Sequence, residues 1–402
     1  MCQLAAQLAL YLLNHPTPQH PSVTSVAKSS YPRAPRSLPT QLPRQPHRSA
    51  NARLPPGGFR SPGMREYRLE LPPQASRARP AFAALHSSFM QTAAPDSPGL
   101  PHPTDGTLAV LRTAAADIKL AHSVFALPFA VLAAFLARDA SSSWARFAGQ
   151  LGLVVLCMVL ARSFAMVVNR FADRSFDARN TRTARRAFAS GRITVAQGLT
   201  LLVAMNALFL GACALFGVCF ANWWPLILAE PVLAFLAFYS YTKRFTWACH
   251  LVLGLALALS PVAATIAIDP GALRTVPAVW YLAGMVALWV AGFDVIYALQ
   301  DIAFDRSEGL KSIPARLGWR GAAWVSRLLH TGAFALLVMA CRSEPRFGML
   351  FGAAVALVGA LLVTEHVVLA RRGEKGLDMA FFTLNGVVSL VLGAAGCADT
   401  LL

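Results

Sequence analysis

From residue 108 onward the chain consists of long apolar stretches that are separated by short polar or Gly/Pro-containing breaks. Each stretch is close to the roughly 20 residues that an α-helix needs to cross the hydrocarbon core of a bilayer. With 56% hydrophobic and only 14% charged residues, the chain is not an ordinary soluble protein. We predict an all-α membrane protein with nine transmembrane helices over residues 118–137, 149–171, 198–220, 224–241, 247–268, 278–300, 321–341, 348–370 and 379–398.

Basic residues in the connecting loops alternate between the two sides of the predicted bundle. The loops after the second, fourth, sixth and eighth stretches carry about three times as many Lys and Arg residues as the intervening loops. Cytoplasmic loops of membrane proteins are enriched in these residues. We therefore predict that these loops face the cytoplasm across a bacterial inner membrane or, alternatively, the matrix across a mitochondrial inner membrane. The net charge of +17 is then largely a topology signal, and no nucleic acid is expected as a partner.

Residues 1–105 differ from the rest of the chain. They are rich in proline and arginine, contain few acidic residues and lack a sustained hydrophobic period. Such a segment cannot bury enough apolar surface to offset its ordering entropy. We predict a disordered basic extension that precedes a transmembrane domain over residues 106–402. The extension has features of an organelle transit peptide. The alternatives are a true start at Met64 or Met90 and a functional N-terminal tail.

Polar side chains with a regular spacing follow the second apolar stretch. Asn169, Asp173 and Asp177 are four residues apart. On an α-helix this spacing gives one stripe that drifts by only about 40° per step. Carboxylates near the end of a membrane helix are costly and usually functional. The stripe therefore predicts an oxygen-rich face suited to a hard divalent cation.

The end of the sixth stretch repeats this pattern. Steps of seven and four residues place Asp294, Asp301 and Asp305 on one helical face. Mg²⁺ is usually bound by a few carboxylates together with phosphate oxygens of a substrate. Two such faces at cytoplasmic helix ends therefore predict a site for Mg²⁺ and a diphosphate. Nearby basic residues that could bind the remaining phosphate oxygens are Arg182, Arg185, Arg186, Lys243, Arg244, Lys311 and Arg316.

These segments resemble the signature motifs of the UbiA superfamily of intramembrane prenyltransferases. Residues 169–177 are similar to its NDxxDxxxD motif, residues 239–246 to its YSxTKRxT element and residues 292–318 to its second aspartate motif. The resemblance covers about residues 108–400. One departure is Arg170, which stands where the first motif usually has Asp. We expect activity to survive this loss of one carboxylate.

The resemblance implies a nine-helix bundle around a lipid-open cavity, in which Mg²⁺ ions held by both aspartate motifs bind a polyprenyl diphosphate. Metal ions and basic side chains would stabilise the departing diphosphate, and an electron-rich aromatic ring would attack the carbocation-like prenyl group. The positions that match metal ligands of the family are Asn169, Asp173, Asp177, Asp301 and Asp305, and Asp294 is a further candidate near the cavity.

Other expected site residues concern the two substrates. Lys243 and Arg182 match diphosphate contacts of the family, and Arg174 matches a position proposed to hold the acceptor carboxylate in the 4-hydroxybenzoate branch. Asp294 or Asp301 is expected to take up the acceptor's proton. Further expected substrate contacts are Arg186, Arg244, Tyr297 and Lys311, and Lys119 either contacts substrate or faces lipid headgroups.

The expected acceptor is a small aromatic acid. Residues 297–301 and 313–318 look closer to bacterial enzymes that prenylate 4-hydroxybenzoate or dihydroxynaphthoate than to haem- or chlorophyll-directed members. We expect 4-hydroxybenzoate, in ubiquinone or menaquinone biosynthesis, with 1,4-dihydroxy-6-naphthoate as the alternative. The rival class, a transporter, would place its carboxylates near the bilayer midplane and show internal repeats. A CDP-alcohol phosphotransferase would need a DGxxAR segment, which is absent from the sequence.

Overall fold

A computed structural model of the protein describes residues 106–118, 125–377 and 379–402. The predicted N-terminal extension and Lys119 therefore lie outside the described residues. Every regular element in the described residues is a helix, which confirms the all-α prediction.

Within the described residues, eight segments are long and apolar enough to cross a membrane. Their main helices are α5 (Trp144–Arg179), α6 (Val195–Phe220), α7 (Trp224–Thr242), α8 (Cys249–Ile268), α10 (Ala278–Tyr297), α12 (Ile313–Ser343), α13 (Met349–Arg372) and α14 (Asn385–Asp399). They correspond to eight of the nine predicted spans.

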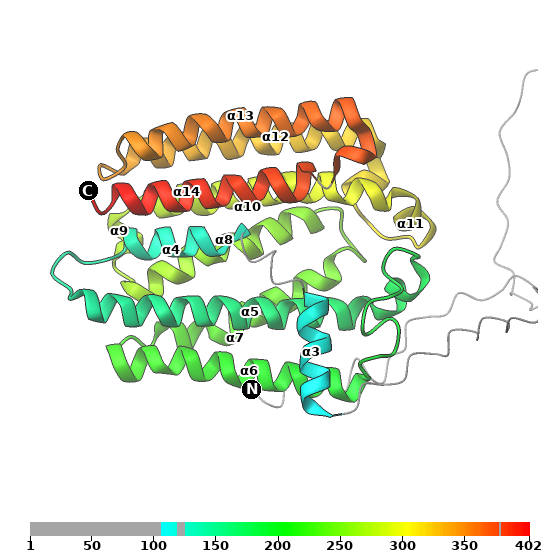
Figure 1. The fold of residues 1–402 in the computed structure, drawn as a ribbon, viewed down its shortest axis with the longest axis horizontal. Coiled ribbons are helices and arrows are strands. Elements are labelled where there is room, and N and C mark those ends of the chain that lie inside the picture. Colours follow the sequence, from blue (N-terminus) through cyan, green and yellow to red (C-terminus); the bar gives the residue numbers. More distant parts are fainter. Residues whose placement is uncertain (1–105, 119–124, 378) are drawn as a thin grey trace, which may run out of the picture. The chain divides into compact units, whose positions relative to one another are not determined.

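The first predicted span is only partly represented. Helix α4 (Leu127–Leu136) has 10 residues, and it begins with Pro128 in its first turn, where a missing N–H group costs nothing. This helix is too short to cross a bilayer alone, so the described residues do not confirm the count of nine. They also contain α3 (Thr107–Ile118), which the sequence analysis did not predict and which is drawn across α5 in Figure 1.

The connections of the bundle separate into two ends. Those after α5, α7, α10 and α13 lie at the right-hand end of Figure 1, together with α11 (Ile302–Ser307). The short helix α9 (Ala272–Thr275) and the C-terminus lie at the opposite end. The arginine-rich loops are therefore gathered at one end of the bundle, as the alternation of charge predicted.

Helix α5 carries the first aspartate motif beyond the apolar layer. It begins at the N-cap Ser143, whose side chain accepts a hydrogen bond from the Arg146 N–H, and it is 36 residues long. A helix of this length spans about 54 Å, against roughly 30 Å for the hydrocarbon core of a bilayer. Its last turns, with Asp173 and Asp177, therefore extend toward the polar end of the bundle.

The second aspartate motif does not continue a single α-helix. Helix α10 ends at Tyr297 and is followed by the 3₁₀ turn η2 (Ala298–Asp301) and then by α11. A 3₁₀ turn holds three residues per turn and changes the direction in which later side chains point. The prediction that Asp294, Asp301 and Asp305 form one helical stripe is therefore wrong.

Helix α10 lies at the centre of the packed bundle. Leu282, Val286, Trp289 and Val290 on this helix are fully buried. Its neighbour α8 approaches it closely at Gly254, because a Cβ atom there would overlap the carbonyl oxygen of Ala287 on α10. Replacement of this glycine would push the two helices apart.

Two irregular turns shape the remaining helices. Gly318 breaks α12 and has a φ of 69°, which is favourable only for glycine. The 3₁₀ turn η3 (Gly373–Gly376) follows α13, and the π-helical turn η4 (Met379–Leu384) leads into α14. Turns of the π type are rare and are frequently found at functional sites.

Candidate functional site

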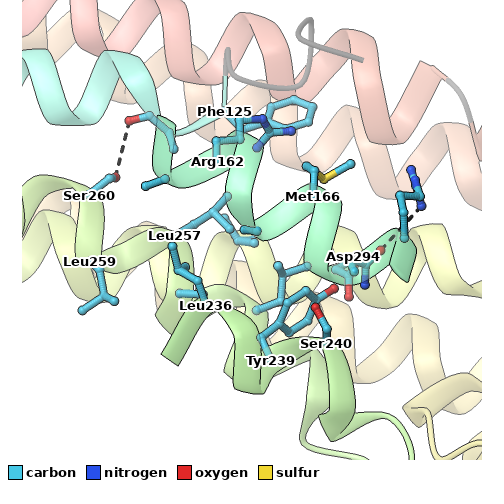
Figure 2. Close-up of a pocket in the computed structure, with 18 of the residues that line it drawn as sticks. Phe125, Arg162, Met166, Leu236, Tyr239, Ser240, Leu257, Leu259, Ser260 and Asp294 are labelled. Atoms are coloured by element: carbon cyan, nitrogen blue, oxygen red, sulfur yellow. Dashed lines mark hydrogen bonds between the residues drawn. The ribbon is translucent and has the colours of Figure 1, made fainter. Parts of the chain in front are cut away.

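A cavity of about 1160 Å³ lies between α5, α7, α8 and α10 (Figure 2). Apolar side chains such as Met158, Leu236 and Leu257 line much of it, and carboxylates and arginines line the part near the basic loops. This combination of an apolar chamber and a charged mouth suits a ligand with a long hydrocarbon tail and an anionic head.

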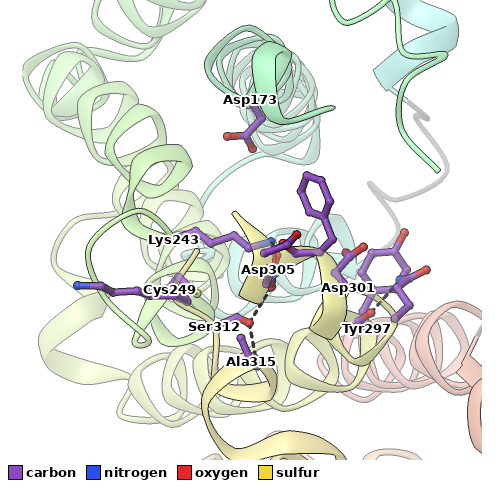
Figure 3. A network of polar contacts seen from close by, with 12 residues as sticks. Asp173, Lys243, Cys249, Tyr297, Asp301, Asp305, Ser312 and Ala315 are labelled. Atoms are coloured by element: carbon purple, nitrogen blue, oxygen red, sulfur yellow. Dashed lines mark hydrogen bonds and ion pairs between the residues drawn. The ribbon is translucent and has the colours of Figure 1, made fainter. Parts of the chain in front are cut away.

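The first aspartate motif forms one wall of the polar part. Asn169, Asp173 and Asp177 all line the cavity, on the stripe of α5 that their spacing predicted. Asn169 Nδ2 donates a hydrogen bond of 3.3 Å to Asp173 Oδ2. Figure 3 shows Asp173 on the opposite side of the site from Asp301 and Asp305. The site therefore has acidic groups on two facing walls.

The three aspartates of the second motif lie in different surroundings. Asp294 and Asp301 line the cavity, whereas Asp305 does not. Asp305 is completely buried, its Oδ1 lies 2.7 Å from Lys243 Nζ, and its Oδ2 accepts a 2.7 Å hydrogen bond from Ser312 Oγ (Figure 3). Asp305 therefore joins the segment after α7 to the start of α12.

Basic side chains pair with the cavity carboxylates. Arg244 Nη2 lies 3.5 Å from Asp173, and Arg186 Nη1 lies 2.7 Å from Asp177. The pair that joins the two motifs is formed by Arg182, whose Nη2 donates to both oxygens of Asp301 at 2.9 and 2.7 Å. The contact between Arg182 and Asp301 holds together the segments that follow α5 and α10.

The electrostatics of the loop cations follow from these contacts. Burial disfavours the charged form of Arg182, but the Asp301 carboxylate outweighs that effect and raises the pKa of the guanidinium above its ordinary value. Asp305 overcomes the burial of Lys243 in the same way and raises the pKa of that ammonium group. Both side chains are therefore cations at physiological pH.

Three predicted substrate contacts lie away from the cavity. Arg174 Nη1 donates to the carbonyl oxygen of Phe171, and Lys311 Nζ donates to that of Phe245. Arg316 stacks on Trp247, with its guanidinium carbon 3.4 Å from the ring centre. None of the three is among the cavity-lining residues. Arg182, Arg185, Arg186, Lys243, Arg244 and Tyr297, by contrast, all line the cavity.

Arg162 is a site residue that the sequence analysis missed. It lies in the middle of α5, lines the cavity, and its Nε is buried without a hydrogen-bond partner. The described residues offer it no ion pair with an acidic side chain. Its signal in the sequence was an arginine inside an apolar stretch, which is costly and usually functional.

Arg170 and His250 were also not assigned a role. Arg170 Nε lies 3.8 Å from Asp117 Oδ2, so the arginine that replaces a motif carboxylate pairs with α3. His250 on α8 lines the cavity and contacts Asp294, with 2.7 Å between Nδ1 and Oδ2. Neither partner could be found from local spacing, because each contact joins helices that are distant in sequence.

The donor set fits Mg²⁺ that is shared with a phosphate-bearing ligand. No group of three His, Cys, Asp or Glu side chains in the described part of the chain is placed to hold a metal ion by itself. The cavity does present hard oxygen donors on two walls, from Asn169, Asp173, Asp177 and Asp301. Mg²⁺ sites commonly use one or two carboxylates and complete their coordination with water and substrate phosphate.

Comparisons with known proteins agree with these observations. The UbiA prenyltransferase family matches residues 126–387. The 4-hydroxybenzoate octaprenyltransferase of Pseudoalteromonas atlantica is 29% identical over 248 residues, or 61% of this chain and 83% of that protein. The enzyme of the same name from Saccharophagus degradans is 32% identical over 260 residues, or 63% of this chain and 80% of that protein.

Solved structures show the same fold. The apo structure of a UbiA homologue from Aeropyrum pernix K1 has a TM-score of 0.62 and 32% identity, and covers 71% of this chain and 99% of that one. A UbiA homologue from Archaeoglobus fulgidus bound to GPP and Mg²⁺ has a TM-score of 0.52 and 19% identity, and covers 72% and 100%. Because the family match spans more than half of its length, this chain belongs to the UbiA prenyltransferase family and is an integral membrane prenyltransferase.

Proposed function

We propose that the protein transfers a polyprenyl group from a polyprenyl diphosphate to a small aromatic acid, with 4-hydroxybenzoate as the acceptor, in ubiquinone biosynthesis. The observation that supports an acidic acceptor is Arg162, a cation in the cavity wall that has no partner among the described residues. The names of the relatives, at about 30% identity, support the same acceptor.

Arg162 is well placed for a carboxylate. It precedes Asn169 by seven residues on α5, which corresponds to about 10 Å along the helix axis. The guanidinium therefore lies deeper in the apolar part of the cavity than the aspartate motifs. Its planar fork matches a carboxylate with two hydrogen bonds. An acid held there would direct its aromatic ring toward the polar end.

The polar end supports the diphosphate. Arg182, Arg185 and Lys243 line it and supply positive charge from two loops. Mg²⁺ held by the oxygen donors of both motifs would stabilise negative charge that develops on the leaving group. The Archaeoglobus fulgidus homologue with GPP and Mg²⁺ is consistent with this arrangement.

The proposed reaction replaces one bond with another. The allylic C–O bond breaks and its electron pair leaves with the diphosphate, while a ring carbon of the acceptor bonds to the prenyl carbon. Arginine and lysine side chains stabilise the departing charge, and the apolar lining keeps water away from the carbocation.

Asp294 is the better candidate to accept the ring proton. Both oxygens of Asp301 already accept hydrogen bonds from Arg182. Among the described residues, Asp294 is contacted only at Oδ2, by His250, and it lines the cavity. Its other oxygen is therefore available to a substrate in the cavity, as a general base requires.

The basic end of the bundle gives a proposed orientation. Since Lys and Arg are enriched in cytoplasmic loops, we place the site at the cytoplasmic face of a bacterial inner membrane. A mitochondrial inner membrane, with the site facing the matrix, is the alternative.

The test is the mass of the product. Membranes containing the full-length protein are incubated with Mg²⁺, a polyprenyl diphosphate and either 4-hydroxybenzoate or 1,4-dihydroxy-6-naphthoate. We expect a prenylated 4-hydroxybenzoate that is lost on addition of EDTA. Product with the naphthoate alone would reassign the acceptor and the pathway to menaquinone. Absence of product with both acids, from protein that still binds the diphosphate, would refute the proposed acceptor class.

A further inference from the structure

His250 connects three helices at the wall of the cavity, which it helps to line. It lies on α8, and its side chain is 4% exposed. Its Nδ1 is 2.7 Å from Oδ2 of Asp294 on α10. Gly254, one helical turn further along α8, allows the close approach of the two helices that this contact requires.

The other ring nitrogen of His250 identifies the tautomer. The backbone N–H of Ile313 donates a hydrogen bond of 3.3 Å to Nε2. A backbone N–H group is only a donor, so Nε2 must be unprotonated and the proton of the neutral ring resides on Nδ1. Ile313 is the first residue of α12, where the N–H has no acceptor within the helix.

The consequence is a directed hydrogen bond from His250 to Asp294. Nδ1–H donates to Oδ2 and fixes the rotation of the carboxylate. Oδ1 of Asp294 accepts no hydrogen bond from the described residues. Because Asp294 lines the cavity and its side chain is 21% exposed, this second oxygen is the one that a ligand can reach.

We propose that His250 is a positioning residue, which holds Asp294 with Oδ1 directed at the aromatic acceptor. This inference rests on the proposed function, in which a ring carbon bonds to the prenyl group, the diphosphate leaves, and the ring proton passes to Oδ1 of Asp294. His250 itself keeps its proton throughout, and it acts through Asp294 because both of its ring nitrogens are already engaged by Asp294 and Ile313.

A purely structural role for His250 would be to accept the N–H group at the start of α12. The two roles use different ring nitrogens, and two substitutions separate them. In His250→Asn the amide nitrogen replaces Nδ1 and keeps the donor to Asp294. In His250→Gln the longer side chain reaches Ile313 but no longer places a donor at Asp294.

The experiment measures steady-state product formation and thermal stability for full-length protein in membranes. We expect His250→Gln to lower kcat about 10- to 100-fold, as is typical when a supporting hydrogen bond is removed from a site residue. The KM values for both substrates should change little, because the two ring nitrogens of His250 are engaged by protein groups and offer no hydrogen bond to a substrate. His250→Asn should retain a larger kcat than His250→Gln, even if it lowers the melting temperature.

A double-mutant cycle with Asp294→Asn tests whether the two residues act as a unit. Asp294→Asn alone should lower kcat by about 10²- to 10⁴-fold, the usual contribution of a general base. Adding His250→Gln should then cause little further loss, because residues that act as a unit are not additive.

Several outcomes would overturn the role of His250. These are an unchanged kcat in His250→Gln, additive losses in the double variant, or losses of kcat in both His250 variants that only follow their melting temperatures. In each of these cases the wild-type protein still forms product, so the proposed function would stand. Wild-type protein that makes no product with either acid overturns both proposals.

Discussion

Replacement of Arg162 by methionine separates acceptor binding from stability. A hydrogen bond to a charged group is worth about 1.5–3 kcal/mol. At about 1.4 kcal/mol per factor of ten, each such bond to the acceptor carboxylate is worth roughly 10- to 150-fold in its KM, so loss of both should raise the KM by at least this factor. The KM for the diphosphate should not change. Without acceptor, Arg162→Met should instead raise the melting temperature, because the arginine has a buried Nε without a partner.

The assay varies the acid at saturating polyprenyl diphosphate and records product by mass. Arg174→Met is the matched control, since this nearby arginine on the same helix donates to the Phe171 carbonyl and lies outside the cavity lining. Its acceptor KM should remain at the wild-type value. An unchanged acceptor KM in Arg162→Met, or a larger effect in Arg174→Met, would refute the assignment of the carboxylate site.

Three further predictions concern the polar end. Asp173→Ala or Asp301→Ala should abolish turnover, measured as product mass, while the protein remains folded in the membrane. Lys243→Met should lower the free energy of unfolding by about 3 kcal/mol, because it leaves the carboxylate of Asp305, which is 0% exposed, without its cation. This value is the low end for a broken buried pair, since the lysine side chain is 36% exposed. Adding Asp305→Asn should recover most of this loss in a thermal melt. Arg179 donates hydrogen bonds to Glu308 and thereby lowers the pKa of that carboxyl group. The stabilisation from this pair is present above the unfolded pKa near 4.3 and is lost as the pH falls through the folded pKa. Glu308→Gln should therefore lower the free energy of unfolding by at most about 1 kcal/mol at pH 7 and should have no effect at low pH.

The first aspartate motif was predictable because it lies on one uninterrupted helix. Asn169, Asp173 and Asp177 occupy α5, where side chains repeat at about 100° per residue. The second motif was not, because η2 interrupts the helix between Asp294 and Asp305. No residue in that segment is a glycine or proline that would announce such a turn. The tighter turn is a consequence of tertiary packing.

The residues missed by the sequence analysis differ in kind. Arg162 was visible in the sequence as a charge within an apolar stretch. His250 was not visible, because its partners are 44 and 63 residues away and become neighbours only when α8, α10 and α12 pack. Arg174 was predicted to bind the acceptor, but it does not line the cavity. Its neighbour in sequence, Asp173, lines the cavity instead.

The number of residues in the π-helical turn η4 affects the width of the cavity, because this turn sets the direction of a cavity-lining side chain. Phe381 in this turn lines the cavity and packs on Tyr297, with 4.1 Å between the ring centres. A π-turn contains one residue more than an α-helical turn. Deletion of a single residue there would restore α-helical register and rotate Phe381 by about 100° away from its neighbour. A change of one residue in the length of this turn would therefore alter the width of the cavity beside Tyr297.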